Sequence, residues 1–237
     1  MISVCMATYN GEAYLKEQIE SILENITEED ELIISDDGSC DHTLDIVKNY
    51  MDMYPNIRFV KGPQKGVIKN FESAIRQAKG EYIFLSDQDD IWESDKVEKV
   101  LACFQNNKCQ VVVHDACIID GEGRQLEQSF YALRGSRAGL LKNLIKNSYL
   151  GCCMAFSAEI TEKILPFPEK IEMHDWWIGL VADTAHASVF ISDSLVRYRR
   201  HDHNVSHMYR HPVKIMIENR IRFIVHLLIR MPGWKKR

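Results

Sequence analysis

The sequence predicts an α/β domain in which helices cover both faces of a mostly parallel central sheet. Three observations support this fold class. Short apolar runs alternate with apolar residues at helical spacing through the first half of the chain. Polar clusters directly follow several of those runs, and 237 residues with 46% hydrophobic side chains suffice for one such core. Alternation of this kind implies right-handed βαβ units.

Five strands are expected in the first half, at Ile2–Thr8, 32–34, 57–60, 82–85 and 111–114. The helices between them are indicated by four apolar stripes: Leu15, Ile19, Ile22 and Leu23; Leu44, Val47, Tyr50 and Met51; Phe71, Ala74, Ile75 and Ala78; Val97, Val100, Leu101 and Phe104. The later pattern is less regular, with a turn at 121–123, helices at Leu140–Ile145 and 176–182, and strands at 189–191 and 195–198. Because no linker or repeat interrupts the chain, we expect one domain over residues 1–205 and a basic amphipathic tail over 206–237.

The composition favours a reducing compartment and anionic partners. Seven cysteines without a Cys-x-x-Cys pair indicate unpaired thiols. Met1 lacks a basic flank, and no stretch reaches the ~18 apolar residues of a membrane-spanning helix. We therefore expect a cytoplasmic protein, with the inner face of the cell membrane as an alternative place. From Leu195 to Arg237 there are 11 Lys and Arg but 2 Asp and Glu, which favours diphosphates or lipid headgroups as partners and not nucleic acid.

Asp87 and Asp89 directly follow an apolar strand. Alternate residues at a strand end can direct two carboxylates to one hard cation, and an all-oxygen site suits Mn²⁺ or Mg²⁺ better than zinc. The alternative is a solvated turn in which Asp90 or Asp95 caps the next helix. Ligands of open α/β sheets bind beyond the carboxyl ends of the strands, where this cluster is expected.

Asp36 and Asp37 also follow a strand and precede a helix. A turn with a left-handed Gly38 and an N-cap at Ser39 or Asp41 explains part of this cluster. Two adjacent aspartates at the edge of a sheet also need hydrogen-bond donors, and a nucleotide base or ribose would supply them.

The chain resembles the inverting family 2 glycosyltransferases of the GT-A fold over roughly residues 1–205. Four motifs carry the resemblance: Ala-Thr-Tyr-Asn at 7–10, Ser-Asp-Asp-Gly-Ser at 35–39, Gly-Glu-Tyr-Ile at 80–83 and Ser-Asp-Gln-Asp-Asp at 86–90. Leu-Ser-Asp-Gln-Asp-Asp-Ile-Trp at 85–92 is similar to the bacterial rhamnosyltransferase-like branch of cell-surface polysaccharide synthesis. Cys40 stands where the family often has Thr.

The resemblance implies a role for each of these motifs. The donor-binding side chains would be Thr8, Tyr9 and Asn10 at the nucleotide, Asp36 or Asp37 at the base or ribose, Asp87 at the ribose or donor sugar, and Asn70 near the donor. Asp89 would ligate the metal beside Asp87. The donor would be a nucleotide-diphospho-sugar such as dTDP-L-rhamnose or a UDP-hexose, and the acceptor a glycan or a lipid-linked hydroxyl.

The segment Glu-Met-His-Asp-Trp-Trp at 172–177 resembles the acceptor side of the family. Asp175 would be the general base, because direct displacement needs the acceptor hydroxyl deprotonated. His174 would lie on the acceptor side, where Trp176 and Trp177 would stack on a sugar. The alternative is that Asp175 caps a helix and both tryptophans belong to the core.

The segment 198–206 resembles the Tyr-Arg-x-His-x-x-Asn element of the family. His201 would contact the metal or diphosphate, and Arg199 or Arg200 would clamp phosphate. Four histidines between 201 and 211 do not follow a structural zinc spacing. The small-residue stretch 151–156 would lie near donor and acceptor, and for its two cysteines we favour inert buried thiols.

The tail predicts an amphipathic helix whose stripe is Ile217, Ile221, Ile224, Val225 and Leu228, followed by Trp-Lys-Lys-Arg at 234–237. Such a helix suits an anionic membrane interface, and packing on the domain or in a dimer is the alternative. Two rival functions remain for the whole chain. A sugar nucleotidyltransferase would need a Gly-rich basic loop after the first strand, where this chain has Thr-Tyr-Asn-Gly-Glu, and a non-catalytic binding protein would not need every expected catalytic position occupied.

Overall fold

The computed structural model describes residues 1–202, 204 and 212–230. Along the chain the elements are β1 Ile2–Thr8, α1 Leu15–Leu23, β2 Glu31–Asp36, α2 Thr43–Met53, β3 Ile57–Lys61, α3 Val67–Ile75, β4 Tyr82–Ser86, β5 Ile91–Trp92, α4 Lys96–Asn106, β6 Val111–Ile119, β7 Gln125–Glu127, α5 Phe130–Arg134, α6 Leu140–Ile145, η1 Gly151–Cys153, β8 Met154–Ser157, η2 Ala158–Ile160, α7 Thr161–Ile164, α8 His174–Asp183, β9 Ser188–Arg199 and α9 Val213–Arg230. The five expected strands and the four helices that follow them in the first half are present.

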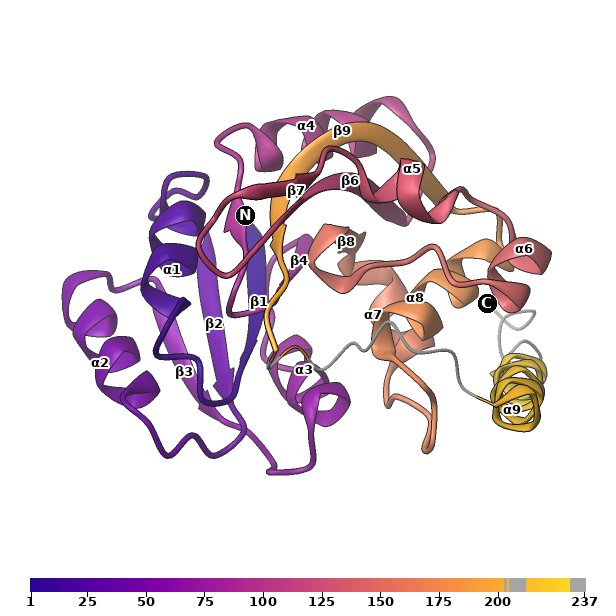
Figure 1. The fold of residues 1–237 in the computed structure, drawn as a ribbon, viewed down its shortest axis with the longest axis horizontal. Coiled ribbons are helices and arrows are strands. Elements are labelled where there is room, and N and C mark those ends of the chain that lie inside the picture. The colour runs from indigo at the N-terminus through magenta and orange to yellow at the C-terminus, as the bar shows by residue number, and fades with distance from the viewer. Residues whose placement is uncertain (203, 205–211, 231–237) are drawn as a thin grey trace.

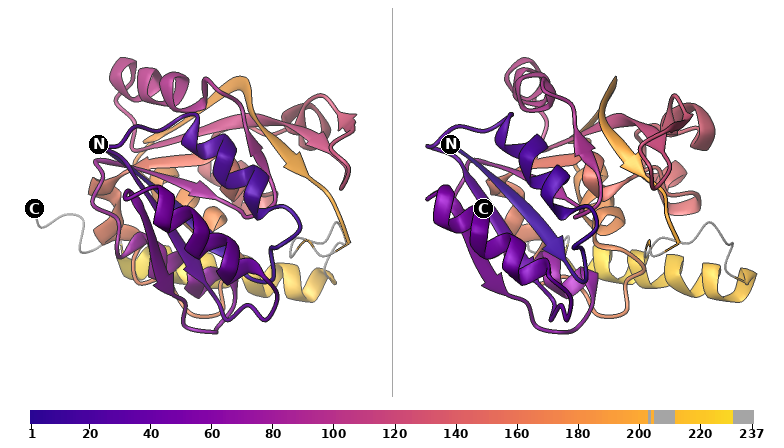
Figure 2. Two further views of the ribbon diagram at one scale, coloured as in Figure 1. Left: turned by 90° about the vertical axis from the view of Figure 1, so that its left-hand side faces the viewer. Right: turned by 60° about the vertical axis from the view of Figure 1, so that its left-hand side comes forward.

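In the described part of the chain, one sheet runs through the molecule in the order β3-β2-β1-β4-β8-β6-β9-β5, and β7 pairs with β6 (Figure 1). The first four strands of this order are parallel. Every residue of β1 and β2 is buried, which explains why their sequences are continuous apolar runs and not alternating ones. The helices α1 and α2 cover one face of these strands and α3 covers the other (Figure 2).

The register of the parallel strands brings their carboxyl ends to one edge. Thr8 of β1 lies opposite Asp36 of β2, and Met6 of β1 lies opposite Ser86 of β4. At the other end of β4, Gly80 approaches the backbone of β1 closely, and a Cβ there would lie 2.4 Å from the Ser3 nitrogen. A larger residue at this position would push the two strands apart.

The sheet is mixed, because β8 enters it antiparallel between β4 and β6. The alternation of the first half does not predict this inserted strand, whose sequence is small and apolar. Strands 189–191 and 195–198 were expected separately, but they form one strand, β9, that follows β6 along its length. The polar residues 192–194 lie on the bend of this long strand, where its register with β6 shifts.

The expected helices at 176–182 and Leu140–Ile145 correspond to α8 and α6. The tail helix α9 lies against α8 at the right-hand end of Figure 1. Phe223 and Leu227 of α9 are buried, and Phe223 packs on Trp176 with 4.8 Å between the ring centroids. The division of the chain at residue 205 stays a prediction, because residues 205–211 and 231–237 lie outside the described residues.

Candidate active site

The ends of β1 and β2 and the loops that follow them, residues 8–14 and 36–42, form one rim of the site. Hydrogen bonds between these two segments stabilise the rim. The buried Asp36 carboxylate accepts four of them, from the backbone N–H groups of Gly38 and Ser39, the Ser39 hydroxyl and the Thr8 hydroxyl. A carboxylate offers about four acceptor positions. Asp36 is therefore fully used inside the protein, and of the two aspartates Asp37 is left as the candidate for the expected contact with a base or ribose.

Asp37 holds the loop between β3 and α3. Its carboxylate accepts the backbone N–H groups of Gln64, Lys65 and Gly66 at 2.7, 3.3 and 2.7 Å. Gly38 has φ of 99°, as the turn interpretation expected. The N-cap of α2 is His42, so neither Ser39 nor Asp41 takes that position.

Asn70 lies beneath this rim and is 1% exposed. Its side-chain amide donates to the carbonyl oxygens of Thr8 and Ser35, and its Oδ1 accepts the Ser35 hydroxyl. The expectation that Asn70 approaches the donor directly is not met in this structure. It ties the ends of β1 and β2 together and thereby positions the rim.

Tyr9 and Asn10 form the outer part of the rim. The Tyr9 side chain is 57% exposed, and its backbone N–H and carbonyl are both held by the Gln88 side chain, at 2.8 and 3.1 Å. Asn10 has φ of 49° and accepts the Cys40 N–H at 2.8 Å. Gln88 therefore couples the motif at 7–10 to the motif at 86–90, a role that its place between two aspartates did not suggest.

The segment after β4 brings three carboxylates together at the centre of the rim. Burial raises the pKa of Asp87, and three neighbouring carboxylates raise it further: Asp90, Asp89 and Asp175. Burial, and then the charge of Asp89, raises the pKa of Asp90 to about 7. The Asp90 Oδ2 is buried and has no hydrogen-bond partner in the described part of the chain. Concentrated negative charge with an unpartnered oxygen is the environment that a bound cation stabilises.

The Asp89 side chain contacts the segment that follows β9. Its Oδ2 lies 2.8 Å from His201 Nε2 and 3.1 Å from Asn204 Nδ2. The two residues expected at the metal, Asp89 and His201, are thus in contact although 112 positions separate them. Asp87 instead groups with Asp90 and Cys152, whose ligand atoms lie within 4.8 Å of one another.

Cys152 is an unsuitable ligand within that group. It is fully buried, and burial raises the pKa of its thiol, so the thiolate that binds metals is disfavoured. Cys153 is also buried, in agreement with the interpretation of both as inert thiols. The carboxylate oxygens of the centre are the ligands that suit a hard cation such as Mn²⁺ or Mg²⁺.

Lys96 lies behind this centre with its side chain fully buried. Its Nζ donates to the Cys152 carbonyl at 2.8 Å and lies 3.8 Å from the centroid of the Trp92 ring. Burial lowers the pKa of Lys96 to about 8, while Asp90 and Asp87 favour its charged form. A lysine in the first turn of a helix is usually exposed to solvent, so the sequence did not indicate that Lys96 is buried beside the carboxylates.

Arg199 is 2% exposed, which is inconsistent with the expected phosphate clamp. Its Nε donates to the Asp89 carbonyl, its Nη2 to Glu17 at 2.6 Å, and its Nη1 to the Gly121 carbonyl. Arg199 therefore fixes the backbone of Asp89 and does not offer its guanidinium to a ligand. Arg200 is half-buried, and its Nη1 donates to the Tyr198 hydroxyl at 3.0 Å.

Asp175 lies in the first turn of α8, and Met173 is the N-cap, so the capping alternative is wrong. Burial raises the pKa of Asp175 to about 7, against hydrogen bonds from the backbone of Trp176 and Gly151 that lower it. The backbone of Gly151 hydrogen-bonds to Asp175, and the Sγ of the next residue, Cys152, lies within 4.8 Å of an Asp87 carboxylate oxygen, which places Asp175 near Asp87. In agreement with this, Asp175 is among the charges that raise the pKa of Asp87. A carboxylate with a pKa near neutrality can take up a proton at physiological pH.

The tryptophans beside Asp175 are core residues, which corrects the expected sugar platform. Trp176 and Trp177 are 2% and 0% exposed, and their indole N–H groups donate to the carbonyls of Asn143 and Ile164. They anchor α8 and so position Asp175. His174 is also buried, stacks on Phe71 at 4.2 Å, and burial lowers its pKa to about 3, so it does not present an acceptor-side charge.

Comparison with known proteins gives the site its context. Residues 3–165 match the family model described as "Glycosyl transferase family 2". The match includes the rim and the carboxylates after β4, and it ends before Asp175 and His201.

Two curated proteins are similar over most of the chain. The dTDP-rhamnosyl transferase RfbG of Shigella flexneri is 29% identical over 222 residues, which cover 84% of this chain and 72% of that protein. An uncharacterized glycosyltransferase of Nostoc sp., alr2836, is 26% identical over 216 residues, covering 87% and 66%. The chain therefore spans about two thirds of the Nostoc protein.

Two solved structures have the same fold. S. aureus TarS (residues 1–349) in complex with UDP-GlcNAc superposes with a TM-score of 0.75 at 20% identity, covering 95% of this chain and 66% of that one. A mannosyltransferase of Pyrobaculum calidifontis in complex with GDP-Man and Mn²⁺ gives a TM-score of 0.62 at 20% identity, covering 81% and 54%. The expected GT-A fold is confirmed by this likeness and by the family match.

Proposed function

Because the chain belongs to glycosyl transferase family 2, we propose that it transfers a sugar from a nucleotide-diphosphate donor to an acceptor hydroxyl with inversion at the anomeric carbon. The observation that carries this proposal is Asp175, a buried carboxylate with a pKa of about 7 that lies near Asp87. A base near neutrality can remove the proton of the acceptor oxygen as that oxygen attacks the sugar. The nucleoside diphosphate leaves from the opposite face of the anomeric carbon.

The proposed cofactor is Mn²⁺ or Mg²⁺ at Asp89, Asp87 and His201. A cation there would neutralise charge that develops on the leaving diphosphate. Support comes from the Asp89–His201 contact and from the unpartnered Oδ2 of the adjacent Asp90. Arg200, which is half-buried on the same segment as His201, is the proposed phosphate contact in place of Arg199.

The proposed donor is a dTDP- or UDP-sugar, with the nucleotide on Tyr9, Asn10 and Asp37 of the rim, whose shape the buried Thr8 supports through its hydrogen bond to Asp36. The similarity to a dTDP-rhamnosyl transferase supports rhamnose, and the likeness to a structure with UDP-GlcNAc supports a UDP-hexose. The proposed acceptor is a glycan or a lipid-linked hydroxyl in bacterial cell-surface polysaccharide synthesis. The reaction would take place in the cytoplasm.

Turnover of the donor tests this proposal. Donor hydrolysis and transfer are measured with Mn²⁺ for the wild type, Asp89→Ala, Asp175→Asn and the control Asp52→Asn, which lies exposed on α2. We expect Asp175→Asn to lose about 10²- to 10⁴-fold in rate and Asp52→Asn to match the wild type. Equal rates for all four proteins would refute the assignment.

The same samples separate the rival functions. A sugar nucleotidyltransferase would release pyrophosphate from a nucleoside triphosphate and sugar phosphate, whereas the proposed enzyme releases a nucleoside diphosphate. A binding protein would show a rise in melting temperature with a nucleotide-sugar and Mn²⁺ but no turnover. The nucleotide-sugar that raises the melting temperature most identifies the donor.

A further inference from the structure

The tail helix α9 has two apolar faces, and only one of them is packed. The packed face carries Asn219, Phe223 and Leu227. The expected stripe lies on the other side: Ile217, Ile221, Ile224, Val225 and Leu228 are between 43% and 60% exposed. The interpretation of α9 as a helix packed on the domain is thus correct for one face and leaves the predicted stripe uncovered in the described structure.

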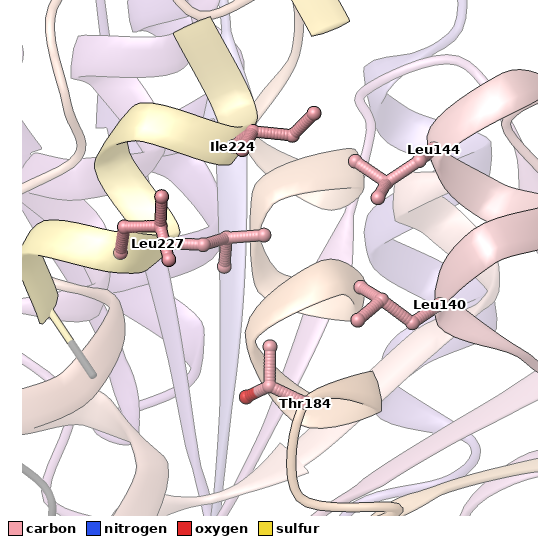
Figure 3. A pocket seen from close by; sticks show the side chains of 6 residues that line it. Leu140, Leu144, Thr184, Ile224 and Leu227 are labelled. Carbon is pink, nitrogen blue, oxygen red and sulfur yellow. The ribbon is translucent and has the colours of Figure 1, made fainter. Parts of the chain in front are cut away.

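A second exposed apolar surface adjoins this stripe. Arg220 of α9 donates to the carbonyl of Ile145 in α6, which places the two helices side by side. Leu141 and Ile145 of α6 are 77% and 74% exposed. Between the helices lies an apolar hollow of about 180 Å³, into which Leu140 and Leu144 project from one side and Ile224 from the other (Figure 3).

Several cations lie on one side of this apolar surface, in and just before α6. The segment from residue 128 to residue 158 contains no Asp or Glu, and it carries Arg134, Arg137, Lys142 and Lys146. Burial lowers the pKa of Lys142, and Lys146, Arg137 and Arg134 lower it further, so these charges lie close enough to repel one another. On α9, the exposed Lys214 adds to them, and Lys235, Lys236 and Arg237 follow later in the sequence.

We propose that α6 and the exposed stripe of α9 form a docking surface for an anionic lipid bilayer. Apolar side chains flanked by Lys and Arg are the chemistry that binds a membrane interface, with the apolar groups in the acyl region and the cations at the headgroups. None of the helices in the described part of the chain has the length and apolarity of a membrane-spanning segment.

A second copy of the chain is the less suitable occupant. A two-fold symmetric interface would bring the same patch of both copies together. The cations of α5 and α6 would then face their own equivalents, and like charges across an interface are unfavourable. An anionic headgroup layer relieves this repulsion.

Point variants test the surface better than removal of α9, because removal would also uncover Trp176. Binding of the full chain to vesicles is measured by co-sedimentation, with phosphatidylcholine alone or with added phosphatidylglycerol. Lys146→Glu and Ile221→Ser change the surface, and Lys48→Glu and Met53→Ser are matched controls on α2, whose side chains are exposed at the opposite end of the molecule (Figure 1).

We expect binding to the phosphatidylglycerol vesicles only, weakened by salt. Each surface variant should lose about tenfold in affinity, and each control should stay near the wild type. Donor hydrolysis should be the same in all five proteins, because the surface does not depend on the proposed reaction. Binding that is absent, that ignores phosphatidylglycerol or that Ile221→Ser leaves intact would overturn the proposal, as would a solution dimer that Ile221→Ser dissociates.

Discussion

The aspartates of the site fall into two groups with opposite environments. On the rim, Asp36 and Asp37 accept four and three hydrogen bonds from the protein itself. At the centre, burial raises the pKa values of Asp87, Asp90 and Asp175. The rim aspartates are therefore held by the protein's own hydrogen bonds, whereas burial disfavours the charged form of the central ones. The hydrogen bonds of the rim give the site its shape, and the central carboxylates are the proposed sites of catalysis and metal binding.

A large loss of stability is expected when the rim is changed. Asp36→Ala removes the acceptor of four hydrogen bonds. The buried hydroxyl of Thr8 and the N–H groups of Gly38 and Ser39 then lose this partner. We expect the free energy of unfolding to fall by about 3 kcal/mol, measured by urea denaturation. The exposed control Asp52→Ala should change it little, and an unchanged midpoint for Asp36→Ala would show that the rim is not self-supporting.

Asp175→Asn should have the opposite sign, because the site penalises the charged form. The folded protein binds the Asp175 proton more tightly than the unfolded chain does, with a pKa of about 7 against 3.8. Stability from this group is thus present at low pH and lost as pH rises between those two values. We expect the variant to gain about 4 kcal/mol at pH 8, at ~1.4 kcal/mol for each pH unit between the two pKa values, and nothing near pH 3. A loss of stability at pH 8 would contradict the raised pKa.

The same pKa predicts the pH dependence of transfer. A base must be unprotonated to act, so kcat/KM should fall about tenfold per pH unit below the pKa of about 7. The profile is measured with saturating Mn²⁺, using nucleoside diphosphate release as the readout. A profile that is flat between pH 5 and pH 7 would remove Asp175 from the role of base.

Tyr9→Ala should have the smallest effect. Its ring is 57% exposed, so we expect no change in melting temperature. Loss of an aromatic surface beside a nucleotide base costs about 1 kcal/mol, and KM for the donor should rise about fivefold with kcat unchanged. The exposed Tyr54 on the far side of α2 gives the matched control, Tyr54→Ala. Equal KM values for both variants would place the nucleotide elsewhere.

Local sequence patterns predicted much of the fold and the motifs that meet at one edge of the sheet. The continuous apolar runs of β1 and β2 and the helical stripes after them were sufficient to place the parallel half. The motifs after β1, β2 and β4 meet at one edge because parallel strands carry their carboxyl ends there. Asp89 and His201, which were both expected near the metal, lie in contact, although the chain between them contains most of the second half.

The role of each single residue in these segments depends on whether its side chain is buried, and the sequence does not show burial. Arg199, Asn70 and the two tryptophans beside Asp175 have the residue types of a binding site, yet each is enclosed and engaged with the protein. Lys96 has the residue type of the surface, yet it lies behind the carboxylates. Hydrogen-bond partners of this kind come from elements far apart in the chain, so no spacing predicts them.

The amino-acid order was enough to establish the alternation of strands and helices, the acidic clusters at the strand ends and the basic apolar tail, because each depends on neighbours within a few residues. Tertiary structure alone decided which carboxylates are satisfied, where β8 enters the sheet and which face of α9 is packed. Those outcomes depend on desolvation and on contacts between distant elements, and both exist only once the chain has folded.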